Sequence, residues 1–461
     1  MLRFLLSLGL LFFAFNLQAQ FKKVHTFKNN VEYVGDYQGN SSLMEVDKSK
    51  GRVNWYSPHD FSLYLSVDLY IPSGYSLDSL YSHDYILDTS SGSKFGYVVK
   101  SGSGNSIGII CNEKGKLIKQ FPDCVSMKIF PAYYRYKLAV VKLKGGTYTT
   151  DVCRLDSNFH VEKSYPTSNL QAGNTFQKDY YDTLYFRYFY VDTKNEEVVV
   201  HGFKHQRIRT IPITVPAGAT LRNTINHFYA AEINSDYGLE FGVYFVKNGT
   251  YSAKIINQYT EVQSFSNASS MQYYELDNDK KALAVSSKPV TIAKREIFKI
   301  DDSKSNNIAS SWFSVNGRFS FSEYFQEGIG LDIDSMSLFH YGYEMRKYRQ
   351  LTVDLGLSKT DEVLASTGYY QGNSDGDGRD YEAYYLWKSN TGKYTFNIKN
   401  NKGVELLKVD NARRFQVNNR FLFNKKSQFS LFVPGSGVEI YEYDFSVKQP
   451  VRITPAHKAK Q

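Results

Sequence analysis

The stretch SIGIICNEKGKLIKQF, residues 106–121, decides the fold because it reads as two apolar strands joined by a short polar turn. Similar units begin at Asp151, Val198, Tyr251, Glu296, Glu344, Lys393 and Val438. Their turn centres lie about 44 to 53 residues apart, which is typical of four-stranded propeller blades. The sequence therefore predicts an all-β fold, a single β-propeller.

Residues 21–105 are less regular and contain one similar unit, LMEVDKSKGRVNWYSP, from Leu43. Its turn precedes the next by about 65 residues, so either a segment is inserted or the first blade is atypical. We expect seven or eight four-stranded blades, with eight favoured. Propellers commonly close by adding an N-terminal strand to the last blade, which would place residues 24–58 beside the C-terminal hairpin.

The composition favours strands, since 38 Tyr and 32 Phe accompany only 11 Pro in 461 residues. Several expected strands are apolar on both faces, for example YKLAVVKL from Tyr136 and LYFRYFYV from Leu184. Blades packed face to face bury both sides of their sheets. Outer-membrane barrels also have aromatic strands, but the irregular segment lengths favour a propeller.

The first residues resemble a secretory signal peptide. Arg3 precedes an apolar run from Leu5 to Phe15, and the small residue Ala19 provides a cleavage point. The run has about eleven residues, whereas a membrane-spanning helix needs about twenty. We therefore expect a signal peptide over residues 1–19 and a propeller over residues 20–461. The mature chain would have no transmembrane span and would be periplasmic, at the cell surface or extracellular.

The formal net charge of +9 comes from scattered Lys and Arg without a dense basic block. Nucleic acid is therefore not an expected partner. In an exported protein, acidic glycans or an anionic cell surface fit this charge better.

Three cysteines leave one unpaired if a disulfide forms. We expect Cys111 and Cys124 on the two arms of one hairpin, so they form the expected pair, with Cys153 as a buried thiol. The alternative is that all three are small core residues.

Asp47, Gly51 and Trp55 in VDKSKGRVNW have the D-x-x-x-G-x-x-x-W spacing of the PQQ-type propeller repeat, which this segment resembles. In that repeat the Gly forms the hairpin turn and the Trp docks between blades. The segment WKSNTGKYTF keeps Thr391 and Gly392 but has Lys388 for the Asp and Phe396 for the Trp. The resemblance covers two short segments and implies the fold, not quinone binding or dehydrogenase activity.

The segment QGNSDGDGRDYE contains a possible calcium loop, in which Asn373, Asp375 and Asp377 alternate before Gly378. Alternating oxygen ligands and a Gly at the bend suit a hard cation. Position twelve is Tyr384 instead of a Glu, so Asp380 or Glu382 would complete the site. The alternative is a plain acidic turn.

His201 and His205 would lie roughly 13 Å apart on a continuous strand, too far to share a metal ion. They would converge only if the turn at residues 202–204 placed them across a ladder; otherwise they are surface histidines flanking a turn. Nucleophile motifs such as G-x-S-x-G and H-E-x-x-H do not occur.

Aromatic clusters mostly predict core packing between blades. Those beside turns, Tyr133, Tyr134, Tyr369 and Tyr370, are candidates for a platform that binds sugars or peptides. We expect an exported binding or scaffolding module for a glycan or a cell-surface protein. The alternatives are a propeller enzyme, a lyase or hydrolase acting on polysaccharide, and an accessory protein of surface assembly.

Overall fold

The computed structural model describes residues 21–35, 41–82, 94–132, 135–156, 158–177, 183–229, 239–257, 261–275, 281–287, 294–300, 308–316, 319–322, 327–332, 335–341, 347–371, 380–400, 402–418 and 426–444. Every regular element in these ranges is a β-strand. The described part of the chain contains no helix that is long and apolar enough to cross a membrane.

The described strands form nine four-stranded antiparallel sheets, which we number as blades 1 to 9 along the chain. Blades 1 to 3 are β2–β5 (Val31–Gly35, Ser41–Asp47, Arg52–Tyr56, Leu63–Asp68), β6–β9 (Tyr75–Ser82, Lys94–Ser101, Ser106–Asn112, Leu117–Pro122) and β10–β13 (Cys124–Ala132, Arg135–Lys144, Thr147–Arg154, Val161–Tyr165). Blades 4 to 6 are β14–β17 (Gln171–Gln177, Thr183–Asp192, Glu197–Gly202, Arg207–Pro212), β18–β21 (Thr220–Tyr229, Leu239–Lys247, Thr250–Asn257, Glu261–Ser266) and β22–β25 (Ala268–Glu275, Lys281–Ser287, Lys294–Ile300, Ile308–Asn316). Blades 7 to 9 are β26–β29 (Phe319–Ser322, Glu327–Asp332, Ser337–Tyr341, Lys347–Asp354), β30–β33 (Glu362–Gln371, Asp380–Lys388, Tyr394–Asn400, Glu405–Asp410) and β34–β36 (Arg414–Asn418, Lys426–Val433, Gly437–Asp444) completed by β1 (Phe21–Phe27).

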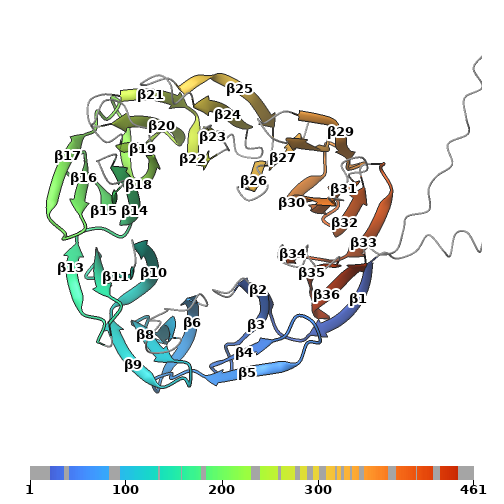
Figure 1. Ribbon diagram of the computed structural model, residues 1–461, viewed down its shortest axis with the longest axis horizontal. Helices are drawn as coiled ribbons and strands as arrows, with labels where there is room; N and C mark the ends of the chain where they lie inside the picture. Colours follow the sequence, from blue (N-terminus) through green and yellow to red (C-terminus); the bar gives the residue numbers. More distant parts are fainter. Residues whose placement is uncertain are drawn as a thin grey trace, which may run out of the picture.

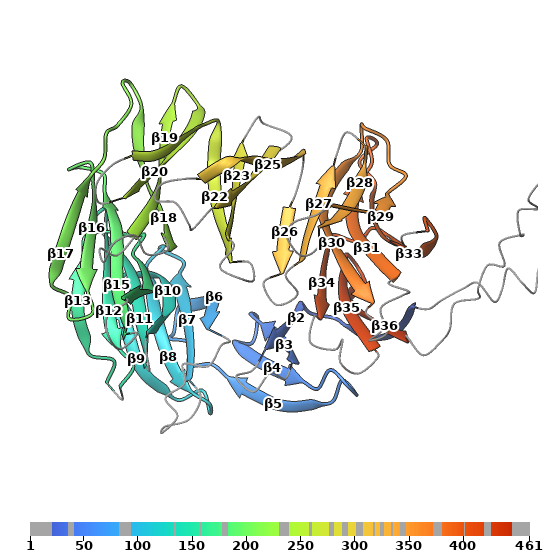
Figure 2. The same cartoon turned by 45° about the horizontal axis from the view of Figure 1, so that its top comes forward.

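The blades form a ring in which the first strand of each lies innermost and the last strand outermost (Figure 1). They follow one another around this ring in chain order, from blue to red (Figure 2). Each blade is an antiparallel meander, so all nine innermost strands run in the same sense and end at the same face of the ring. The prediction of an all-β, single propeller is confirmed.

The ring has one blade more than the eight favoured by the sequence. The unit from Leu43 corresponds to β3 and β4, the second and third strands of blade 1, whereas the unit from Ser106 corresponds to β8 and β9, the third and fourth strands of blade 2. The long interval between their turns therefore reflects a change of hairpin and not an insertion. Blade 1 is a complete blade and adds one to the count.

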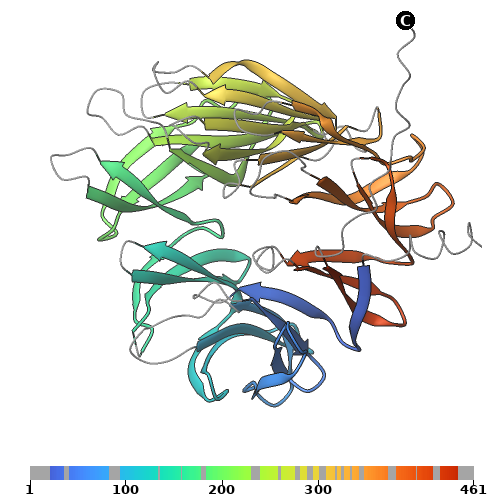
Figure 3. The ribbon, with the colours of Figure 1, turned by 45° about the vertical axis from the view of Figure 1, so that its right-hand side comes forward.

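The N-terminal strand closes the ring, as the sequence suggested. β1 pairs antiparallel with β36, with Phe21 opposite Tyr443 and Phe27 opposite Val438. Figure 3 shows this blue strand alongside the red strands of blade 9. Three C-terminal strands and one N-terminal strand thus form a single sheet, so that no blade edge is left open between the two ends of the described chain.

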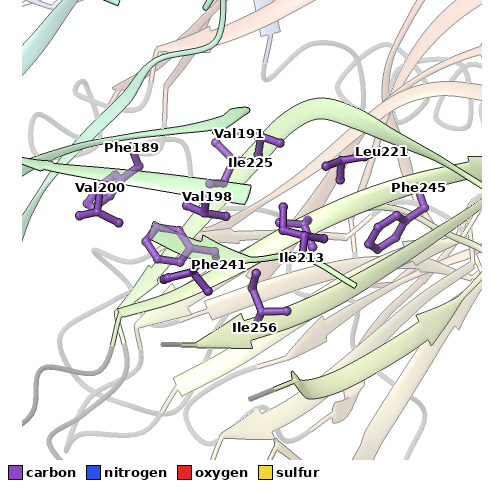
Figure 4. Packing of buried hydrophobic residues seen from close by; sticks show 12 residues of the cluster. Phe189, Val191, Val198, Val200, Ile213, Leu221, Ile225, Phe241, Phe245 and Ile256 are labelled. Carbon is purple, nitrogen blue, oxygen red and sulfur yellow. The ribbon is translucent and has the colours of Figure 1, made fainter. Parts of the chain in front are cut away.

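Side chains from both faces of each blade form the core. On β16, Val198 and Val200 pack against blade 5, and Val199 between them packs against blade 3. Figure 4 shows the first of these clusters, where Phe189 and Phe241 meet between blades 4 and 5. Each fully buried side chain of this size stabilises the fold by about 1.5 to 3 kcal/mol, so packing between blades holds the ring together.

The turns follow from local side-chain chemistry. In the β8–β9 turn, Oδ1 of Asn112 accepts hydrogen bonds from the backbone N–H groups of Lys114 and Lys116. Gly115 has φ +74, and a Cβ atom there would lie 1.9 Å from the carbonyl oxygen of Asp68 in blade 1. Only glycine fits this turn against its neighbour, which explains why N-x-x-G marks the hairpin.

Candidate functional site

The structure places two of the four candidate platform residues at the end of an innermost strand. Tyr369 and Tyr370 are among the last three residues of β30, where they pair with Glu382 and Tyr381 of β31. Tyr133 and Tyr134 lie outside the described residues. The strands on either side of them are β10, which ends at Ala132, and β11, which begins at Arg135.

Tyr369 and Tyr370 belong to a pattern that recurs around the ring. In blades 1 to 8 an aromatic residue occupies one of the last three positions of the innermost strand: Tyr33, Tyr81, Phe130, Phe176, Tyr229, Tyr274, Phe321 and Tyr370. These strand ends all lie at one face of the ring. Sequence reasoning found only one member of this set, because the pattern emerges when the innermost strands are aligned.

Part of this pattern serves packing. Phe130 is buried in the cluster between blades 3 and 4, and the hydroxyl of the buried Tyr33 donates a hydrogen bond of 2.9 Å to Gln428 of blade 9. These contacts agree with the expectation that most aromatic clusters form core. The other six residues are assigned to this face by their position in the strand alone.

The candidate calcium ligands Asn373, Asp375 and Asp377 lie outside the described residues. Asp380 is the first residue of β31 and pairs with Gln371, the last residue of β30. Among the residues that the structure describes, no three His, Cys, Asp or Glu side chains lie close enough together to hold a metal ion.

His201 and His205 are not surface histidines, and the turn between them does bring them together. His201 lies at the end of β16, and its Nδ1 is 3.2 Å from the backbone oxygen of His205 in the following turn. The Tyr165 hydroxyl, from blade 3, lies 2.8 Å from Nδ1 of His205. The expectation of surface histidines was wrong, because this turn packs against β13, the last strand of the preceding blade. Strand spacing in the sequence does not reveal this contact.

A buried ion cluster completes this contact between blades 3 and 4. Both carboxylate oxygens of Glu162 accept hydrogen bonds from Lys137 Nζ, at 2.7 and 2.8 Å, and Oε1 also accepts one of 2.9 Å from Arg154. Nε2 of His205 lies 3.2 Å from Oε2 of Glu162. The exposed ring of Phe203 lies 5.2 Å from the Lys137 ammonium.

The electrostatics of the cluster indicate a structural role. Burial alone would raise the pKa of Glu162, but hydrogen bonds from Lys137, His205 and Arg154 lower it to about 2. Burial also lowers the pKa of His205, although Glu162 opposes that shift. A carboxylate with three donors is a poor base, so Glu162 serves to join the two blades.

The structure corrects the expected disulfide. Cys124 does not lie on the second arm of the hairpin that contains Cys111, because β9 ends at Pro122 and Cys124 begins β10 of blade 3. Cys111, Cys124 and Cys153 are free and buried. Burial raises the pKa of Cys124 and of Cys153 to about 12, so neither is a reactive thiolate.

The positions that resemble PQQ-type repeats have the implied local structure. Gly51 has φ +62 in the β3–β4 turn, and buried Trp55 lies 5.2 Å from Phe95 of blade 2 between ring centroids. Gly392 has φ +86 in the β31–β32 turn, and Phe396 packs against Phe415 of blade 9. These residues therefore serve turn formation and blade packing.

The fold is that of a β-propeller. No protein-family model and no curated protein matches the sequence. Similar solved structures include the Dos1 propeller (9% identity, TM-score 0.37, covering 92% of this chain and 95% of that chain) and Hsv2 of Kluyveromyces lactis (10%, TM-score 0.35, 85% and 94%). Another is the dihydro-heme d1 dehydrogenase NirN (13%, TM-score 0.40, 70% and 66%). At these identities and TM-scores, the likenesses say nothing about what this chain binds or does.

Proposed function

We propose that this chain is an exported binding or scaffolding propeller that holds a glycan, or a protein at the cell surface, on the face where its innermost strands end. The observation that carries the proposal is the recurrence of an aromatic residue at that end of eight consecutive innermost strands. Aromatic rings stack on the apolar faces of sugars and on peptide side chains, and tyrosine adds a polar hydroxyl.

Three features support export and a binding role. The N-terminal residues have the pattern of a signal peptide, which would bring the chain to the periplasm, the cell surface or the medium. The net charge of +9 suits acidic partners. Asn373, Asp375, Asp377 and Asp380 follow β30 in the sequence, and we propose that their oxygen atoms bind calcium. We propose that the likeness to PQQ-type repeats ends at turn geometry and includes no quinone site.

The test is retention of the chain from Gln20 on a panel of neutral and acidic polysaccharides, with new chain ends measured in the same tubes. The double variant Tyr369→Ala/Tyr370→Ala is expected to lose retention. Tyr148→Ala is the matched control, since this exposed tyrosine lies beside the β11–β12 turn at the opposite face. New chain ends would favour the alternative, a lyase or hydrolase. Absence of retention on every polysaccharide would rule out the glycan and leave a cell-surface protein as the proposed partner.

A further inference from the structure

A polar row runs from β10 of blade 3, through the segment that precedes β14 and the first residue of β14, to β18 of blade 5; these blades are neighbours in the ring (Figure 1). We call it the amide seam and define it as Lys128, Ser168, Asn169, Gln171 and Asn223. Lys128 Nζ lies 3.4 Å from Gln171 Oε1, and Gln171 Nε2 donates to Asn169 Oδ1 at 3.2 Å. Asn169 Nδ2 donates to the backbone oxygen of Asn223 at 2.9 Å, and Asn223 Nδ2 donates to Ser168 Oγ at 3.2 Å.

The backbone is irregular at Asn223, one end of the seam. The pairing of β18 with β19 shifts register between Leu221 and Ile225, so Asn223 lies in a β-bulge. A bulge changes the direction of a side chain that a regular ladder would hold, and such bulges are frequent beside binding sites. Asn223 and Lys128 are exposed, and the three residues between them in the seam are half-buried.

The seam has unused hydrogen-bonding capacity. Lys128 carries three N–H donors, of which Gln171 takes one. The side-chain oxygen of Asn223 accepts no hydrogen bond from any residue that the structure describes. Amides supply donors and acceptors side by side, as the adjacent hydroxyl groups of a sugar require.

Lys128 gives the seam a positive charge without an internal counter-ion. Its ammonium lies 5.4 Å from the Phe130 ring, and no carboxylate of the described residues forms an ion pair with it. Although the Lys128 side chain is exposed overall, neighbouring atoms desolvate its ammonium in part and lower the pKa of Lys128. A carboxylate from a ligand would offset this desolvation.

We propose that the amide seam binds an acidic glycan, in which a sugar carboxylate pairs with Lys128 and neighbouring hydroxyls bond to Asn169, Gln171 and Asn223. The inference rests on the proposed glycan-binding function, names its ligand class and adds a second contact region. Gln171 begins β14 and Asn223 is the fourth residue of β18, whereas Tyr369 and Tyr370 lie near the end of β30. A ratio of one cation to four neutral polar residues suits a hydroxyl-rich chain better than a phosphodiester chain, whose binding depends on many cations. An acidic peptide shares the carboxylate but lacks the hydroxyls.

The experiment compares two probes by calorimetry: an oligogalacturonate and the same oligomer after reduction of its carboxyl groups. The wild-type chain from Gln20 is expected to bind the acidic oligomer and to bind the reduced one at least about tenfold more weakly, because a charge-assisted hydrogen bond is lost. Lys128→Met should weaken binding of the acidic oligomer by about tenfold, and Lys128→Arg should restore it. Asn223→Ala should weaken binding of both oligomers.

Lys408→Met is the matched control, because this exposed lysine lies on the outermost strand β33 of blade 8 and its loss should leave binding unchanged. Thermal melting of each variant checks that the ring remains folded. Equal binding of both oligomers, binding of polyglutamate as tight as of oligogalacturonate, or unchanged binding by both Lys128→Met and Asn223→Ala would overturn the inference. If seam variants bind normally while Tyr369→Ala/Tyr370→Ala does not, the seam assignment fails and the proposed function stands.

Discussion

Lys137 and Glu162 form an ion pair of 2.7 Å in which the two side chains are only 5% and 12% exposed. The pair joins the second and fourth strands of blade 3 and contacts His205 of blade 4 through Glu162. Two charges that are removed from water to this extent stabilise the fold only while both are present. The pair therefore makes blade 3 sensitive to the loss of either partner.

Glu162→Ala is expected to lower the free energy of unfolding by about 3 to 5 kcal/mol, because it leaves the Lys137 ammonium buried without a partner. The double variant Lys137→Met/Glu162→Met should lower the free energy of unfolding by less than Glu162→Ala does, since it removes both charges. Urea unfolding measures the difference. Arg52→Ala is the control, because the Arg52–Asp68 pair is exposed on both sides and its loss should leave the free energy of unfolding nearly unchanged. A double variant that is less stable than Glu162→Ala would contradict this account.

His227 should make stability depend on pH between about 6.5 and 4. Its ring stacks on Phe189 at 4.5 Å, and burial, followed by the charge of Arg187, lowers the pKa of His227 to about 4. Because this pKa is below its unfolded value, the unfolded chain binds the proton first. The neutral ring of His227 therefore contributes about 3 kcal/mol to the free energy of unfolding above pH 6.5. This contribution is lost as the pH falls from 6.5 to 4.

His227→Phe tests this. Nε2 of His227 is buried without a hydrogen-bond partner among the described residues, so an apolar ring should be tolerated. The variant should be at least as stable as wild type at neutral pH and should lose less stability on acidification to pH 4. Urea unfolding at pH 7 and pH 4 gives both values. Equal losses in the two proteins would show that other groups carry the acid sensitivity.

Sequence alone was sufficient for the architecture, because the hairpin signals are local. Asn112 and Gly115 make their turn with neighbours in the chain, and the same chemistry recurs at Asn400 and Gly403. The blade count required knowing which strands each hairpin joins, and this depends on pairing across blades. The unit from Leu43 was therefore not recognised as part of a complete blade, blade 1, which brings the count to nine.

The candidate sites depend on contacts that sequence spacing does not reveal. His205 meets Glu162 across 43 positions, and Asn169 meets Asn223 across 54 positions, in both cases between neighbouring blades. The prediction that His201 and His205 lie apart assumed a continuous strand, and a turn replaces it. Aromatic residues beside turns were recognisable, because their type and position are local properties.

Closure of the ring should depend on Phe27, the last residue of β1. Its ring is 6% exposed and lies 4.8 Å from Tyr56 and 6.4 Å from Phe61, both of blade 1. Phe27→Ala is expected to lower the free energy of unfolding by about 3 to 5 kcal/mol, through lost contacts and the cavity that remains. Phe432→Ala, at a phenylalanine that is 36% exposed in the same blade, should cost clearly less. Equal costs in urea unfolding would mean that β1 does not hold the ring closed.

Calcium should raise the melting temperature of the wild-type chain if the Asn373–Asp380 loop binds it. Gln371, the last residue of β30, pairs with Asp380, the first residue of β31, so the two residues that flank the segment lie side by side. Calcium at 100 times its dissociation constant would add about 2.7 kcal/mol of stability. In a chain of this size, that raises the melting temperature by a few degrees. Asp377→Ala should abolish the shift, since it removes a central ligand.

Asp361→Ala, at the other end of β30, should retain the shift, because the Asp361 carboxylate accepts hydrogen bonds from the backbone N–H groups of Ser358 and Asn390 instead. A shift that survives Asp377→Ala would place any calcium elsewhere, and no shift in the wild type would leave the loop as an acidic turn between two strands.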